Sequence, residues 1–132
     1  MHEDIRERFA DVTAAVEKIR SRGGKIVFVR FPHTGGLKEL EDRITPREKT
    51  WDPLLKMTGA PGIYYSDFPE LSGFNCPEWS HLSAGDSVEF SKRLVSHLRD
   101  ALNMQVPLAA SAWVKGNTNL ICLYDETFTN NN

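Results

Sequence analysis

The sequence lacks several features that would place a protein in a particular class. It has only two cysteines, no long apolar run and no block of basic residues. Cys76 and Cys122 are too few for a disulfide framework and match no metal-ligand spacing, so we expect two free thiols, no metal and no cofactor. No run approaches the ~18 apolar residues of a membrane span. With 16 basic and 18 acidic side chains, the chain also shows no electrostatic footprint for nucleic acid.

What remains is the composition of one globular domain. Forty per cent hydrophobic and 26 per cent charged residues are ordinary values. The first residues lack the apolar core of a signal peptide. That observation leaves the compartment undecided, with the cytoplasm favoured.

Two apolar segments predict buried strands. Residues 25–31 are nearly continuous in apolar and β-branched side chains, and residues 62–66 form a second such segment. Runs without alternation suit parallel strands that are covered on both faces. We therefore predict an α/β fold with three α/β/α layers and a short parallel sheet, built from these two strands and helices on both faces.

Helical periodicity accounts for most of the remaining chain. Apolar residues recur at spacings of three and four over residues 3–22. The last predicted helix begins at Ser83, with Asp86 in a capping-box position. A long loop is expected at 67–77. The predicted helices cover residues 3–22, 37–44, 46–58 (interrupted or restarted at Pro53) and 83–102.

Residues 77–83, which we call the His81 block, carry the strongest chemical signal. Glu78 stands three residues before His81, and a carboxylate beside an imidazole is the orienting half of a nucleophilic triad. The block follows the carboxyl end of a predicted parallel strand, where α/β proteins bind ligands. We expect Glu78 and His81 to hydrogen-bond, with one imidazole edge open to solvent. The alternative is a structural pair that fastens the loop to the final helix.

The His81 block resembles the last conserved block of the SGNH hydrolases, the GDSL-like esterases and acyl-hydrolases, which reads Asp-x-x-His before an apolar residue and the final helix. Glu78 stands where the family has its Asp, and His81 where it has its base. Residues 25–32 and 62–71 look like the last two core strands. The resemblance implies that residues 1–103 form the carboxyl-terminal part of a flavodoxin-like SGNH domain. It also implies His81 as general base, Glu78 as its orienting acid and a small acyl ester as substrate.

The amino-terminal half of such a domain has no counterpart here. In the family it carries a Gly-Asp-Ser nucleophile block and the residues that complete the oxyanion hole. Residues 85–87 spell Gly-Asp-Ser, but they begin a helix only four residues after His81, so we expect Ser87 to be non-catalytic. Activity of this chain alone is therefore doubtful. The alternative function is a non-catalytic fragment or interaction domain that keeps the half-fold as a scaffold.

An incomplete sheet should be completed by its own tail, by a second copy in a homo-oligomer or by a missing amino-terminal segment. The tail, residues 104–132, matches nothing in the family. We predict a short edge strand at 119–124 and a frayed end from residue 127.

Three further side chains are candidates for substrate contact: Arg30, Arg47 and Trp79. Arg30, near the end of the first strand, either pairs with a carboxylate or reaches a ligand. Arg47 either borders an acyl pocket together with Trp51 or meets a carboxylate. His33 is predicted to be a surface turn residue.

Overall fold

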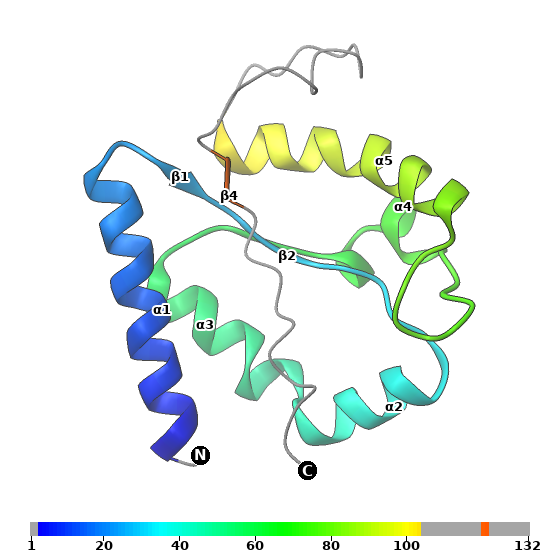
Figure 1. Cartoon of the computed structure of the whole chain (residues 1–132), viewed down its shortest axis with the longest axis horizontal. Helices are drawn as coiled ribbons and strands as arrows, with labels where there is room; N and C mark the ends of the chain where they lie inside the picture. The colour runs from blue at the N-terminus through cyan, green and yellow to red at the C-terminus, as the bar shows by residue number, and fades with distance from the viewer. Residues whose placement is uncertain (1–2, 104–119, 122–132) are drawn as a thin grey trace.

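The computed structural model describes residues 3–103 and 120–121, and it has a mixed α/β architecture (Figure 1). The remainder of the tail, including its predicted frayed end and Cys122, lies outside the described residues. The elements in chain order are α1 Glu3–Ser21, β1 Lys25–Ile26, β2 Phe28–Arg30, α2 Gly35–Ile44, the 3₁₀ turn η1 Arg47–Lys49, α3 Trp51–Thr58, β3 Gly62–Tyr64, the 3₁₀ turn η2 Tyr65–Asp67, α4 Pro69–Ser72, α5 Ala84–Leu102 and β4 Leu120–Ile121.

The predicted parallel pairing of the two apolar strands is confirmed. β2 lies parallel to β3, with Phe28 opposite Gly62 and Arg30 opposite Tyr64. The strands are shorter than predicted. The first is divided at Val27 into β1 and β2, and the second ends at Tyr64, because the chain turns into η2 there.

A second parallel pair joins distant parts of the chain. β1 pairs with β4, and Lys25 lies opposite Leu120. The edge strand predicted at 119–124 is therefore present over its two described residues. Each of these two sheets has two strands among the described residues, so both remain narrow.

Alternate residues of the β1–β2 segment enter two separate core clusters. Ile26 and Phe28 pack with Val16 of α1 and with Ala60, whereas Val27 and Val29 pack with residues of β3 and α5. This alternation follows from the two-residue period of an extended chain. In Figure 1, α1 and α3 lie on one side of β2, and α4 and α5 lie on the other.

The two long helices agree with their sequence signals. The Ser83 hydroxyl accepts a hydrogen bond from the Asp86 N–H at 3.1 Å, which is the predicted N-cap of α5. Phe90, Leu94 and Leu102 are buried along this helix. The helix ends at Leu102 and is followed by the capping residue Asn103, whose φ of 49° is the left-handed conformation common at helix ends.

Two smaller elements differ from the expectation. The helix predicted at 46–58 is two elements, η1 and α3, and the second starts afresh at Trp51. Pro53 lies in the first turn of α3, where a backbone N–H has no helical acceptor and its loss costs little. The expected long loop after the second strand contains the short helix α4, which begins at Pro69. Proline suits this first position because its φ is already helical.

Helix α2 contacts the rest of the protein through the polar contacts of Glu41 with Arg30 and His33, and through the ring of Trp79 against its first residues. It contributes no buried side chain, and Leu40 and Ile44 are exposed.

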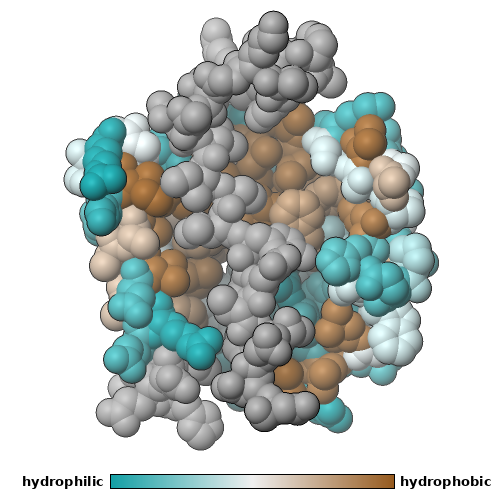
Figure 2. Space-filling view, viewed as in Figure 1, coloured by the Kyte–Doolittle hydropathy of each residue, from teal (hydrophilic) through white to brown (hydrophobic). Residues whose placement is uncertain are grey.

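Figure 2 shows apolar side chains on both sides of the atoms drawn in grey, toward the middle of that face. No helix among residues 3–103 is both long enough and apolar enough to cross a membrane.

Candidate functional site

The His81 block contains the predicted acid–imidazole pair. Nδ1 of His81 lies 2.7 Å from Oε1 of Glu78, so the predicted hydrogen bond is present. The side chains of His81 and Glu78 are 69% and 62% exposed, and the imidazole is therefore open to solvent, as expected. A pair this exposed contributes little to stability.

Ser80 adds a third member to this pair. Its hydroxyl donates to Oε2 of Glu78 at 3.0 Å and lies 2.8 Å from Nδ1 of His81. Because Ser80 and Glu78 meet the same ring nitrogen, Ser80 cannot occupy the nucleophile position of a triad, which lies at the opposite nitrogen. Ser80 therefore braces the pair.

The charge of Glu78 decides which ring nitrogen carries the proton. The hydrogen bonds from His81 and Ser80 lower the pKa of the Glu78 carboxyl, so it is an ionised acceptor at neutral pH. An ionised carboxylate can only accept, and Nδ1 must then carry the proton in the 2.7 Å contact. The lone pair of the neutral ring lies on Nε2, which has no hydrogen-bond partner within residues 3–103. His81 is thus arranged to accept a proton at Nε2.

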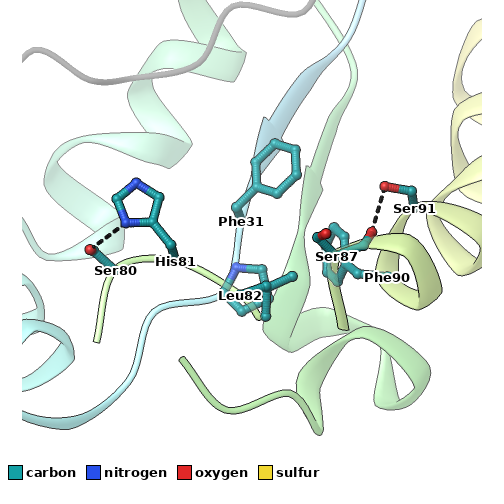
Figure 3. A pocket seen from close by; sticks show the side chains of 8 residues that line it. Phe31, Ser80, His81, Leu82, Ser87, Phe90 and Ser91 are labelled. Atoms are coloured by element: carbon teal, nitrogen blue, oxygen red, sulfur yellow. Dashed lines mark hydrogen bonds between the residues drawn. The ribbon is translucent and has the colours of Figure 1, made fainter. Parts of the chain in front are cut away.

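A pocket of about 300 Å³ opens beside His81, between the end of β2 and the start of α5 (Figure 3). Ligand sites begin near this volume. Figure 3 shows His81 on one side and Ser87 on the other, with Leu82 between them. The pocket is lined by Phe31, Pro32, Ser80, His81, Leu82, Ser87, Phe90 and Ser91.

Ser87 lines this pocket but is not poised as a nucleophile. Its hydroxyl donates to the carbonyl oxygen of Ala84 at 2.8 Å, within the first turn of α5. No hydrogen bond joins Ser87 to His81 in the part of the chain that the structure describes. This arrangement agrees with the prediction that residues 85–87 begin a helix.

Arg30 adopts the pairing alternative rather than facing the pocket. Its guanidinium forms an ion pair with Glu41 of α2. The same carboxylate oxygen lies 2.9 Å from Nε2 of His33. Glu41 therefore connects the end of β2 to α2 through two side chains.

The prediction that His33 is a surface turn residue is wrong. His33 is only 6% exposed, and its ring lies edge-on to Tyr65 with 5.6 Å between ring centroids. Burial lowers the pKa of His33, and the nearby Glu41 carboxylate opposes that shift. The turn after Pro32 directs this side chain inward, toward a residue 32 positions later in the chain.

Arg47 and Trp79 also lie away from the pocket lining. Nη2 of Arg47 donates to Asp67 at 2.9 Å, and its guanidinium carbon lies 4.7 Å from the centre of the Tyr64 ring. Trp51 packs against a core cluster instead of bordering an acyl pocket. The indole of Trp79 lies against Gly35 and Gly36. A role of these residues in substrate contact remains a prediction.

Sequence reasoning missed several residues of the pocket. Ser91 follows Ser87 by one helical turn in α5, so the helical period could have identified it. Phe31 could have been inferred from its place at the end of a strand that leads to a ligand crevice. Phe90 carried a signal for burial only.

Two further observations bear on reactive groups. Cys76 is a buried free thiol, as predicted, and burial raises its pKa. Within the described residues, no group of three or more His, Cys, Asp or Glu side chains is arranged to hold a metal ion.

Comparison with known proteins shows that the chain matches no family model, no curated protein sequence and no solved structure. The resemblance of the His81 block to the SGNH hydrolases therefore remains a prediction from its residues.

Proposed function

We propose that this chain carries the general base and the orienting acid of an SGNH-type ester hydrolase, and that its nucleophile comes from a segment outside the described residues. The observation that supports this proposal is the hydrogen bond between Nδ1 of His81 and Glu78, at 2.7 Å. It leaves Nε2 unbonded within the described part of the chain, beside a pocket.

Each member of the pair has a role in such a reaction. His81 would take the proton of a serine hydroxyl at Nε2 and later give it to the leaving group. Glu78 would hold the ring in the required tautomer and stabilise the imidazolium. Glutamate is one methylene longer than the family's aspartate, and the turn that carries Ser80 brings its carboxylate back to Nδ1.

The pocket favours a small, uncharged acyl group. Phe31, Pro32, Leu82 and Phe90 supply apolar walls, and no Lys, Arg, Asp or Glu lines the pocket. The pocket volume of about 300 Å³ is at the small end of the range for ligand sites. A charged ligand would find no counter-charge in this lining.

We also infer the finer architecture that this function requires, a three-layer α/β/α half-domain. The two core clusters on alternate residues of β1–β2 support it. The pairing of β4 with β1 supports the expectation that the tail helps to complete the sheet. Two narrow sheets still leave strand edges for a second copy or an amino-terminal segment to cover.

A second candidate function is a non-catalytic scaffold or interaction domain. The 69% exposure of His81 favours it, because catalytic pairs work best where water is excluded. The use of the Ser87 hydroxyl within its own helix also favours it. In this alternative, the contacts among Glu78, Ser80 and His81 only shape the loop.

Turnover of short-chain aryl esters tests the proposal. We expect none from the purified chain, because residues 3–103 supply neither a hydroxyl at Nε2 of His81 nor an oxyanion hole. A chain extended at its amino terminus by a strand, a Gly-Asp-Ser loop and a helix should gain turnover and should be labelled by a fluorophosphonate. His81→Ala should abolish both gains, and Ser87→Ala should retain the fluorophosphonate label.

Two outcomes would contradict the proposal. If the purified chain is labelled stoichiometrically and Ser87→Ala removes the label, the nucleophile is Ser87 and the proposed site is wrong. If the extended chain folds but neither reacts nor turns over ester, the scaffold function is the better explanation.

A further inference from the structure

Trp79 has a backbone conformation that its residue type disfavours. Its φ is 74°, a region in which bulky non-glycine residues are outliers. Such strain persists only where the surrounding contacts determine the conformation, and it concentrates at functional sites. Burial does not explain it, since Trp79 is 54% exposed.

Two backbone hydrogen bonds hold Trp79 in this conformation. Its N–H donates to the carbonyl oxygen of Cys76 at 2.9 Å, which closes a turn. Its carbonyl oxygen accepts from the N–H of Thr34, also at 2.9 Å. The turn that carries Trp79 is therefore attached to the residue that precedes α2.

The indole ring makes the third contact, with the first residues of α2. A β-carbon placed on Gly35 would lie 2.5 Å from the indole Nε1, and one on Gly36 would lie 3.3 Å from Cζ3. Gly35 also has a φ of 59°, which favours glycine. Only glycine at position 35 admits the ring at this distance.

Trp79 stands between the members of the acid–imidazole pair, directly after Glu78 and two residues before His81. Cys76, before them, exchanges two hydrogen bonds with the Thr34 side chain, one at 3.1 Å to the Cys76 carbonyl oxygen and one at 3.2 Å from its N–H. Glu78 and His81 are themselves largely exposed. Their position relative to the pocket thus depends on how the loop is attached, because packing around them is sparse.

We propose that Trp79 is a positioning residue, whose indole locks the loop of the Glu78–His81 pair onto Gly35 and so holds that pair beside the pocket. This inference rests on the proposed function only because it takes the Glu78–His81 pair as the catalytic part of the site. The attachment of the loop to Gly35 can be measured without any ester turnover.

The test compares Trp79→Gly with Trp79→Phe. Glycine accepts a φ of 74° without strain, so Trp79→Gly keeps the backbone conformation available and removes only the ring. We expect the loop to detach and the pKa of Glu78, followed by carboxyl NMR, to rise toward its ordinary value as its hydrogen bonds loosen. Trp79→Phe keeps an aromatic ring and should retain most of the lowered pKa.

Gly35→Ala disturbs the same contact by adding a β-carbon against the indole of Trp79, and it should also raise the pKa of Glu78. Gly23→Ala is the matched control, since Gly23 also has a positive φ, of 80°, and a β-carbon there meets nothing within 4 Å, and it should leave the pKa of Glu78 unchanged. In the Trp79→Gly background, Gly35→Ala should have no additional effect on this pKa. That comparison separates the ring contact from the backbone strain of an alanine at position 35, where φ is 59°, because this strain is the same in both backgrounds.

The proposal is overturned if Trp79→Gly leaves both the pKa of Glu78 and the NMR contacts between the loop and α2 unchanged. It is also overturned if, in an ester-hydrolysing extended chain, Trp79→Phe raises only KM while that pKa stays lowered, because Trp79 would then contact substrate. If the extended chain folds without turnover while the pKa of Glu78 responds to these substitutions as expected, the result contradicts the proposed function alone.

Discussion

The thiol of Cys76 donates a hydrogen bond to the carbonyl oxygen of Pro32 at 3.2 Å, across 44 positions of the chain. Pro32 lines the pocket, and Cys76 opens the turn that leads to the His81 block. This contact joins the end of β2 to the loop that carries the acid–imidazole pair, and it buries the sulfur.

We expect Cys76 to react slowly with iodoacetamide in the folded protein. Burial raises the pKa of its thiol, so less of the reactive thiolate is present at neutral pH. A Cys122→Ser variant makes Cys76 the single thiol, and mass spectrometry follows the modification. Denaturant should accelerate the reaction strongly. Rapid stoichiometric labelling of the folded variant near pH 7 would contradict the buried position.

Because His33 is buried, we expect the protein to lose stability in mild acid. Burial lowers its pKa in the folded state, whereas the unfolded chain has the ordinary value of about 6.5. Folding therefore favours the neutral form of His33. The contribution of this residue to the free energy of unfolding is fully present above about pH 6.5, and it is lost as the pH falls through the lower pKa of the folded state.

Urea unfolding at a series of pH values measures this effect. The free energy of unfolding should fall below about pH 6.5, in a window above the one in which Glu70 and Glu78, whose pKa values are lowered, titrate. His33→Gln, which cannot be protonated, should flatten the upper window. If the variant keeps the wild-type slope there, another group is responsible.

Phe90 should dominate the stability of the α5 side of the core. It is 1% exposed and contacts Phe31 and Phe74 at centroid distances of 5.4 and 5.5 Å. Phe90→Ala should cost about 3–5 kcal/mol, the usual range for a buried aromatic side chain. Val88→Ala, at a position 56% exposed on the same helix, should change the free energy of unfolding by less than about 0.5 kcal/mol. Equal losses in the two variants would refute this packing.

The N-cap of α5 offers a smaller and more local effect. Ser83→Ala removes the acceptor for the Asp86 N–H, which should cost about 1 kcal/mol. Ser96→Ala, inside the same helix and exposed, is the control, and it should be neutral or slightly stabilising because alanine favours helices. Chemical denaturation compares the two. A neutral Ser83→Ala would show that the cap contributes nothing.

Local patterns in the sequence were sufficient for the elements that form from neighbouring residues. The apolar spacing predicted α1 within one residue of its end, and Ser83 with Asp86 predicted the start of α5. The pairing of Glu78 with His81 is also local, since three positions along a turn bring the two side chains within reach. These features depend on backbone geometry over a few residues, which composition and spacing encode directly.

Contacts between distant segments were decided only by the tertiary structure. Thr34 meets Cys76 across 42 positions, and the indole of Trp79 finds Gly35 through that connection. The burial of His33 and the choice of Glu41 as the partner of Arg30 depend on where α2 lies. No local pattern specifies such contacts, because each joins residues that are far apart in the sequence. They meet only when the two elements that carry them pack in one particular orientation. The sequence alone thus predicted the local pairing of Glu78 with His81, and only the tertiary structure gave the contacts that join their loop to Thr34 and Gly35.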